Sequence, residues 1–218
     1  MNKAASSEGE PRIEITPPRL LGPGAVLAVS AYGLVLVVPV FISMLAVSVM
    51  RLGWPTFAIP AATLAAVTFF LPLGFGNPHV AKLVRALGPA PGAEPGGWAV
   101  QLTCTPRLRA GLRALLDDAD DVGLLCFEPT ALVFRGDSVQ LRVPLESIQE
   151  VRRRNIGWRG LFVYGHRTVV VAPGLQNITR LEFSERCSWS LPGSRKASRQ
   201  LYERLRQAAL AQPVDGET

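Results

Sequence analysis

An uncharged apolar run dominates the first third of this 218-residue chain. Between Leu20 and Ala81 the single formally charged residue is Arg51, which lies where the apolar stretch is interrupted. As continuous helices, residues 24–50 would extend about 40 Å and residues 54–73 about 30 Å, enough to cross a hydrocarbon core. The pattern predicts a two-helix transmembrane hairpin over residues 24–75, with spans at 24–50 and 54–73. A buried helical hairpin in a soluble domain is the alternative.

The cations that flank this run predict its orientation. Two arginines precede the first span, and Lys82 and Arg85 follow the second, whereas the turn holds only Arg51. Under the positive-inside rule, both termini then face the cytoplasm. The expected location is the bacterial inner membrane as a multi-pass protein, with the lipid bilayer as its integral partner.

The rest of the chain is predicted to contain a separate folded domain. Residues 1–23 read as a polar N-terminal tail, residues 76–97 as a linker rich in proline and glycine, residues 98–211 as the domain, and residues 212–218 as a tail. Apolar alternation and turn residues predict strands at 98–104, 123–127, 131–135, 138–143, 148–153, 161–164, 168–172 and 177–183. Helical spacing of apolar residues predicts a short helix at 106–118 and a C-terminal helix at 194–210.

The strand pattern from Gly123 onward resembles the opening strands of pleckstrin-homology-like domains, most closely the GRAM and bacterial PH types. The resemblance rests on residues 123–127, 131–134 and 139–145, followed by Ile148 and Val151. It implies an α+β fold in which the hairpin precedes a PH/GRAM-like antiparallel β-barrel or sandwich with a C-terminal capping helix. It also implies a role in binding lipid or protein.

No pattern of catalytic residues is visible, so we expect no enzyme, no metal and no cofactor. The two histidines, His79 and His166, have no sequence neighbours that would make them bases or metal ligands. The three cysteines are odd in number and far apart, and they match neither a disulfide framework nor a metal site. They are Cys104, Cys126 and Cys187.

An acidic group follows the short predicted helix. It consists of Asp117, Asp118, Asp120 and Asp121. Carboxylates at the carboxyl end of a helix oppose its dipole. A solvated helix end, paired with the domain's own arginines, is the favoured interpretation, and a site for a divalent cation or a basic partner is the alternative.

A basic group supplies the candidate binding site. Its residues are Arg152, Arg153, Arg154, Trp158 and Arg159. Arginine beside tryptophan suits anionic lipid headgroups or a protein partner. Three consecutive arginines on a strand cannot share one face, however, so a solvated strand end is the alternative. The chain has a net charge of +6, but the basic residues of the domain are scattered along it. We therefore expect no nucleic acid as partner.

These observations favour a membrane-anchored, non-enzymatic binding or scaffold module. It would present its PH/GRAM-like domain to anionic lipid headgroups or to a protein partner. The alternative is a structural subunit or assembly factor of a larger membrane complex, with the hairpin as its interface.

Overall fold

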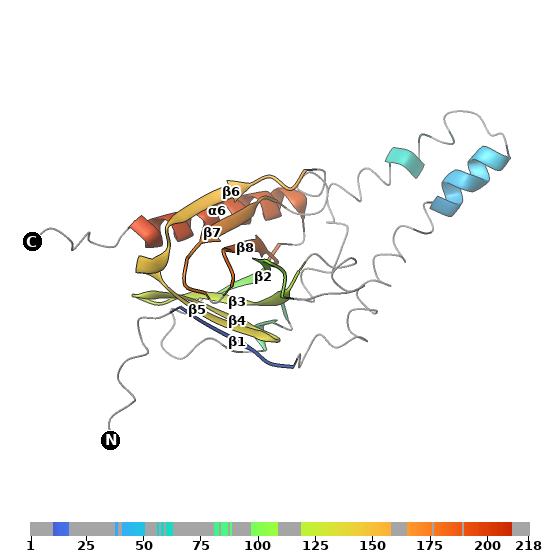
Figure 1. The fold of residues 1–218 in the computed structure, drawn as a ribbon. Coiled ribbons are helices and arrows are strands. Elements are labelled where there is room, and N and C mark those ends of the chain that lie inside the picture. The colour runs from blue at the N-terminus through green and yellow to red at the C-terminus, as the bar shows by residue number, and fades with distance from the viewer. Residues whose placement is uncertain are drawn as a thin grey trace, which may run out of the picture.

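The described residues form an eight-stranded antiparallel sheet followed by a long C-terminal helix (Figure 1). The computed structural model describes residues 11–17, 38, 41–50, 56, 58, 60–62, 81–82, 84–86, 88, 97–108, 119–157, 165–175, 177–188 and 190–210. The strands are β1 (Arg12–Ile15), β2 (Trp98–Thr105), β3 (Asp121–Phe127), β4 (Ala131–Gly136), β5 (Val139–Pro144), β6 (Glu150–Arg154), β7 (Arg167–Val171) and β8 (Arg180–Glu185). A 3-10 turn, η1 (Leu145–Ser147), links β5 to β6, and helix α6 (Leu191–Leu210) follows β8.

The strand order is β1-β5-β4-β3-β2-β8-β7-β6, so β1 and β6 are the two edge strands. Strands β2 to β5 are neighbours in chain order, and short connections join β3 to β4 and β4 to β5. Strand β8 then pairs with the free side of β2, and β7 and β6 extend the sheet from there. In Figure 1, β6 and β7 lie beside α6 in the upper part of the view, and β1, β4 and β5 lie in the lower part.

Alternating apolar residues build the core on one face of the sheet. In β5, Val139, Leu141 and Val143 are buried while Gln140 between them is exposed, which is the period of two that a half-buried strand requires. Helix α6 closes this core over β6, β7 and β8, and its Leu201 and Leu205 are fully buried. A smaller apolar cluster, which includes Leu124 of β3, lies on the other face.

Two buried aspartates hold neighbouring segments through backbone hydrogen bonds. Asp121 accepts from the backbone N–H groups of Ser138 and Val139 at 2.8 and 2.6 Å, so its carboxylate organises the turn between β4 and β5. Asp120 accepts from the N–H of Cys104 at 2.6 Å and from that of Leu108 at 3.1 Å. Both aspartates are at most 1% exposed, so the prediction of a solvated acidic helix end is wrong for this pair. Residues 117 and 118 lie outside the described part of the chain.

The predicted transmembrane hairpin is corrected by the structure. Among the described residues, no helix has both the length and the apolar character needed to cross a membrane. Within the first expected span, residue 38 and residues 41–49 are helical. Most of the spans 24–50 and 54–73 lies outside the described residues. The physical reason for the error is that apolar composition does not guarantee one continuous helix, least of all where prolines recur.

The membrane assignments that depended on the hairpin are withdrawn with it. These are the multi-pass location in the bacterial inner membrane and the cytoplasmic placement of both termini. The predicted barrel or sandwich is also wrong, because the sheet is open and no pairing joins β1 to β6 in the described residues. Alternation predicts strands, but it does not say which pairs would close a barrel.

Several local predictions can be compared directly with the structure. The C-terminal helix expected at 194–210 is present as α6, and seven of the expected strands match β2 to β8 with shifted ends. The expected strand at 161–164 and residues 109–118 of the expected short helix lie outside the described residues, and residues 106–108 are not helical. Strand β1 lies within the segment expected to be a polar tail.

Replacing Gly136 by alanine should destabilise the β4–β5 turn. A Cβ atom there would lie 2.0 Å from Asp121 Oδ2 and 2.7 Å from the backbone oxygen of Val139. We expect the free energy of unfolding of the whole chain to fall by about 1–3 kcal/mol in urea denaturation. Gly193→Ala in α6 is the matched control, because its nearest neighbour is the hydroxyl of Ser190 at 3.0 Å and alanine favours helix. Equal stability of the two variants would contradict the role assigned to Gly136.

Candidate binding surface at the β6 edge

Strand β6 leaves one side of its backbone without a partner strand in the described part of the chain. It pairs with β7 through a register that runs from Glu150 opposite Val171 to Arg154 opposite Arg167. Its other side ends the sheet. Four of its five residues are exposed, and the fifth, Val151, is half-buried. The β6 edge is therefore a row of backbone donors and acceptors that faces outward.

The three consecutive arginines of β6 divide between the two faces of the sheet. Arg153 lies on the α6 side, where its guanidinium carbon is 5.9 Å from the ring centroid of Tyr202. Arg152 and Arg154 lie on the opposite side by strand alternation. Arg152 forms an exposed ion pair with Glu150 at 3.7 Å. Of the predicted basic group, the structure describes Arg152, Arg153 and Arg154. Residues 158 and 159 lie outside the described part of the chain.

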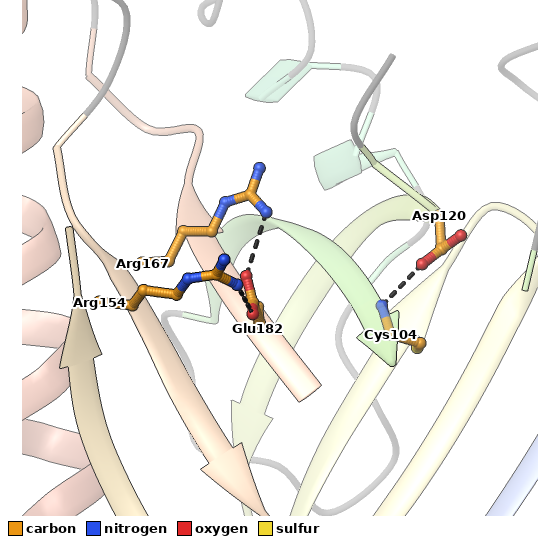
Figure 2. A network of polar contacts seen from close by, with 5 residues as sticks. All are labelled: Cys104, Asp120, Arg154, Arg167 and Glu182. Carbon is orange, nitrogen blue, oxygen red and sulfur yellow. Dashed lines mark hydrogen bonds and ion pairs between the residues drawn. The ribbon is translucent and has the colours of Figure 1, made fainter. Parts of the chain in front are cut away.

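A buried carboxylate fixes the position of Arg154. Figure 2 shows the guanidinium groups of Arg154 and Arg167 pointing at the carboxylate of Glu182 on β8. Nη1 of Arg154 donates to Oε1, and Nη1 of Arg167 donates to Oε2 at 3.1 Å. The side chain of Glu182 is 1% exposed and that of Arg154 is 53% exposed. The network therefore links the buried centre of the sheet to the β6 edge.

Arg167 belongs to this buried network and not to the surface. It is 5% exposed, although it lies close in the sequence to the basic group at residues 152–159. A second buried arginine, Arg186, donates to the side-chain oxygen of Gln101 on the same face. These contacts pair two arginines in the interior, so Arg167 and Arg186 do not belong to the exposed basic surface. They were missed because charge in a sequence does not reveal a buried acceptor on another strand.

Helix α6 adds cations beside Arg153. Residues 195, 199, 202 and 206 fall on one face of a helix with 3.6 residues per turn. Since Tyr202 of this face contacts Arg153, the face lies next to β6, and it carries Arg195, Arg199 and Arg206. We call these three arginines, together with Arg152, Arg153 and Arg154 of β6, the basic edge.

The electrostatic effect of the basic edge is visible at His166. Desolvation lowers the pKa of this histidine, and the positive charges of Arg153 and Arg195 lower it further. The histidine immediately precedes β7, and next to it the N–H of Gly165 donates to Oγ of Ser194 in α6 at 3.1 Å. Cations from β6 and from α6 therefore act on the same point, which supports treating them as one positively charged surface.

The remaining reactive side chains show no catalytic arrangement within the described residues. Burial, followed by the charges of Asp120 and Asp121, raises the pKa of Cys104 to about 12. Burial and then Glu185 also raise the pKa of Cys187. Thiols held in the protonated form are poor nucleophiles and poor metal ligands. The described part of the chain holds no group of three or more His, Cys, Asp or Glu residues that could bind a metal.

Comparison of the sequence with protein-family models and with curated proteins finds no match. A function for the β6 edge must therefore be inferred from its own geometry and charge.

Replacing Glu182 by glutamine should destabilise the sheet strongly. Glutamine in place of Glu182 removes the negative charge that faces the buried guanidinium of Arg167 and the guanidinium of Arg154. We expect the free energy of unfolding to fall by about 3 kcal/mol, measured by urea denaturation. Arg152→Gln, which removes only an exposed ion pair, should change it by less than about 1 kcal/mol. A loss for Glu182→Gln as small as that of the control would show that the network is unimportant for stability.

Replacing Arg195 by glutamine should raise the pKa of His166. The physical reason is the loss of a nearby positive charge that opposes protonation of the imidazole. Proton NMR titration of the two histidines measures this shift, with His166→Gln assigning the signal and Arg199→Gln as a control of equal charge. Because folding lowers this pKa, the unfolded chain binds the proton first as the pH falls below 6.5, and stability should decrease there. If the pKa of His166 is unchanged in Arg195→Gln, α6 does not belong to the positively charged surface.

Proposed function

We propose that the folded unit is a non-enzymatic binding module whose β6 edge accepts an extended acidic segment of a protein partner. The segment adds to the sheet as a further strand. The observation that carries this proposal is the division of three consecutive arginines between the two faces of a strand that ends the sheet in the described part of the chain.

Strand addition accounts for this division of charge. The side chains of an added strand alternate above and below the sheet, like those of β6 itself. Successive carboxylates of the partner would therefore meet Arg153 on one face and Arg152 or Arg154 on the other. A run of consecutive acidic residues uses every arginine of the strand, whereas a ligand that approaches one face alone does not.

The charge of the edge also selects among possible strands. Arginines on an edge strand oppose pairing with apolar or basic strands, a means by which natural sheets avoid aggregation. An acidic segment neutralises the same charges as it binds. Discrimination between partners then comes from repulsion as well as attraction.

The resemblance to PH-like and GRAM domains is kept as part of the proposal. The described fold shares with that pattern a series of antiparallel strands followed by a terminal helix that packs on the sheet, but its sheet is open. The resemblance is consistent with a role in binding and contributes no additional site residue.

A short synthetic peptide with a central run of glutamates should bind the full chain, and its glutamine counterpart should not. Arg153→Glu and Arg152→Glu should each weaken binding by roughly tenfold in fluorescence anisotropy, because each change replaces an attraction with a repulsion on one face. Lys82→Glu, an exposed change of equal charge before β2, should have no effect. Affinity should fall as salt is added.

Peptides that carry N-methyl groups separate strand addition from charge attraction alone. Alternate N–H groups of an added strand point toward β6, and the others point away. Methylation of one alternate set should abolish binding, and methylation of the other set should preserve it. If both methylated peptides bind equally, or if phosphatidylserine vesicles bind and the peptide does not, the proposal is wrong.

A further inference from the structure

The opposite edge of the sheet already holds a strand that comes from far away in the sequence. Strand β1 pairs with β5, with Ile13 opposite Leu141 and Glu14 opposite Gln140. The N–H of Thr16 extends the pairing by donating to the backbone oxygen of Ser138 at 2.7 Å. The chain next enters the sheet at Trp98, so β1 is a short docked segment at the end of a long connection.

One side chain anchors this segment. Ile13 is 7% exposed and belongs to the main core, whereas the other three residues of β1 are exposed. Arg12 lies opposite Arg142 of β5, whose guanidinium forms an ion pair with Glu128 at 2.6 Å. The segment is also bounded by proline, with Pro11 packed near Gly174 and Pro17 after Thr16. Prolines cannot donate to a ladder, so the docked strand has defined ends.

We propose that the β5 edge is a strand-acceptor site and that β1 of a second copy of this chain can occupy it, which gives a dimer with exchanged β1 strands. Residues 12–15 are the segment that the structure shows to fit this edge, and each copy carries both the segment and the acceptor. All contacts of β1 are reproduced in the exchanged state because the two copies are identical.

Because the connection is long, the extent of strand exchange should depend on the protein concentration. A strand joined to its own acceptor by a short linker is held at high effective concentration, and this advantage decreases as the linker lengthens. The connection from Pro17 to residue 80, ahead of the buried Ala81 and Val84, is long in sequence, so a second copy can compete with the chain's own β1. Release of β1 from β5 breaks one strand pairing and exposes one buried side chain, that of Ile13. Strands β2 to β5 keep their pairings with one another. This exchange concerns β5 and is independent of ligand binding at β6.

Disulfide trapping between two full-length variants tests the exchange. One variant carries Glu14→Cys and the other carries Gln140→Cys, each in a Cys187→Ser background because Cys187 is the partly exposed thiol. Facing residues of antiparallel strands have a Cα separation of about 4.5–5.5 Å, which a disulfide can bridge. After mixing, incubation and mild oxidation, we expect a linked heterodimer in an amount that increases with protein concentration.

Control variants decide between exchange and random collision. Glu14→Cys mixed with Arg152→Cys, on the opposite edge, should give roughly tenfold less linked dimer, because those positions are never paired. Adding Ile13→Glu to the Glu14→Cys chain should remove the linked dimer, since a charged side chain cannot enter the core. A double variant, Glu14→Cys with Gln140→Cys, should link within one chain when dilute.

Two results would overturn the proposal. The first is a double variant that links within its own chain while the mixed single variants stay monomeric at every concentration. The second is equal linkage in the pair that contains Arg152→Cys. Failure of the double variant to link at all would also overturn it, because β1 would then not be docked on β5.

Discussion

An open antiparallel sheet has two strands whose outer backbone groups need a partner or a means of excluding one, and this constraint organises the molecule. At one end, β1 covers β5 and is itself only four residues long. At the other end, β6 carries three consecutive arginines. One edge is thus protected by a docked segment and the other by charge. Both devices are also recognition features, because a docked segment can be exchanged and a charged edge attracts its opposite.

The position of β6 depends on polar contacts as well as on the core. Helix α6 packs over β6, β7 and β8 on one face, and Glu182 gathers Arg154 and Arg167 on the other. The half-buried Val151 contributes little apolar area, so a strand as polar as β6 needs such additional contacts to stay in the sheet. The same contacts present Arg153 and Arg154 on opposite sides of the edge.

The sequence predicts local structure where one period dominates. Alternation in residues 131–143 located β4 and β5, and the helical spacing near the C-terminus located α6. Strand β1 was missed because its alternation of polar and apolar residues lasts for only four residues and its partner strand is more than a hundred residues away. The arginines at 152 to 154 were recognised as divided between faces, but Glu182 as their acceptor was not, since only tertiary structure joins β6 to β8 across β7.

The errors share one cause, which is that composition does not determine environment. Uncharged residues were read as membrane spans, yet a span also requires a long continuous helix. Charged residues were read as solvated, yet Asp120 and Asp121 are buried and bind backbone N–H groups. A carboxylate can satisfy several N–H groups at once, so a polar residue near a strand end often serves the backbone.

Compared with apolar residues of similar volume, the Glu182 network contributes position more than stability, although breaking it by removing Glu182 alone is costly. Buried ion pairs are often no more stabilising than well-packed apolar residues of similar volume, because both charges lose their hydration. Apolar residues in place of Glu182 and Arg167 could therefore hold β8 and β7 together equally well. They could not orient the guanidinium of Arg154, whose side chain is 53% exposed at the edge. The buried carboxylate of Glu182 holds the guanidinium of Arg154 in a defined orientation where a partner strand would lie. A leucine at this position could not do so.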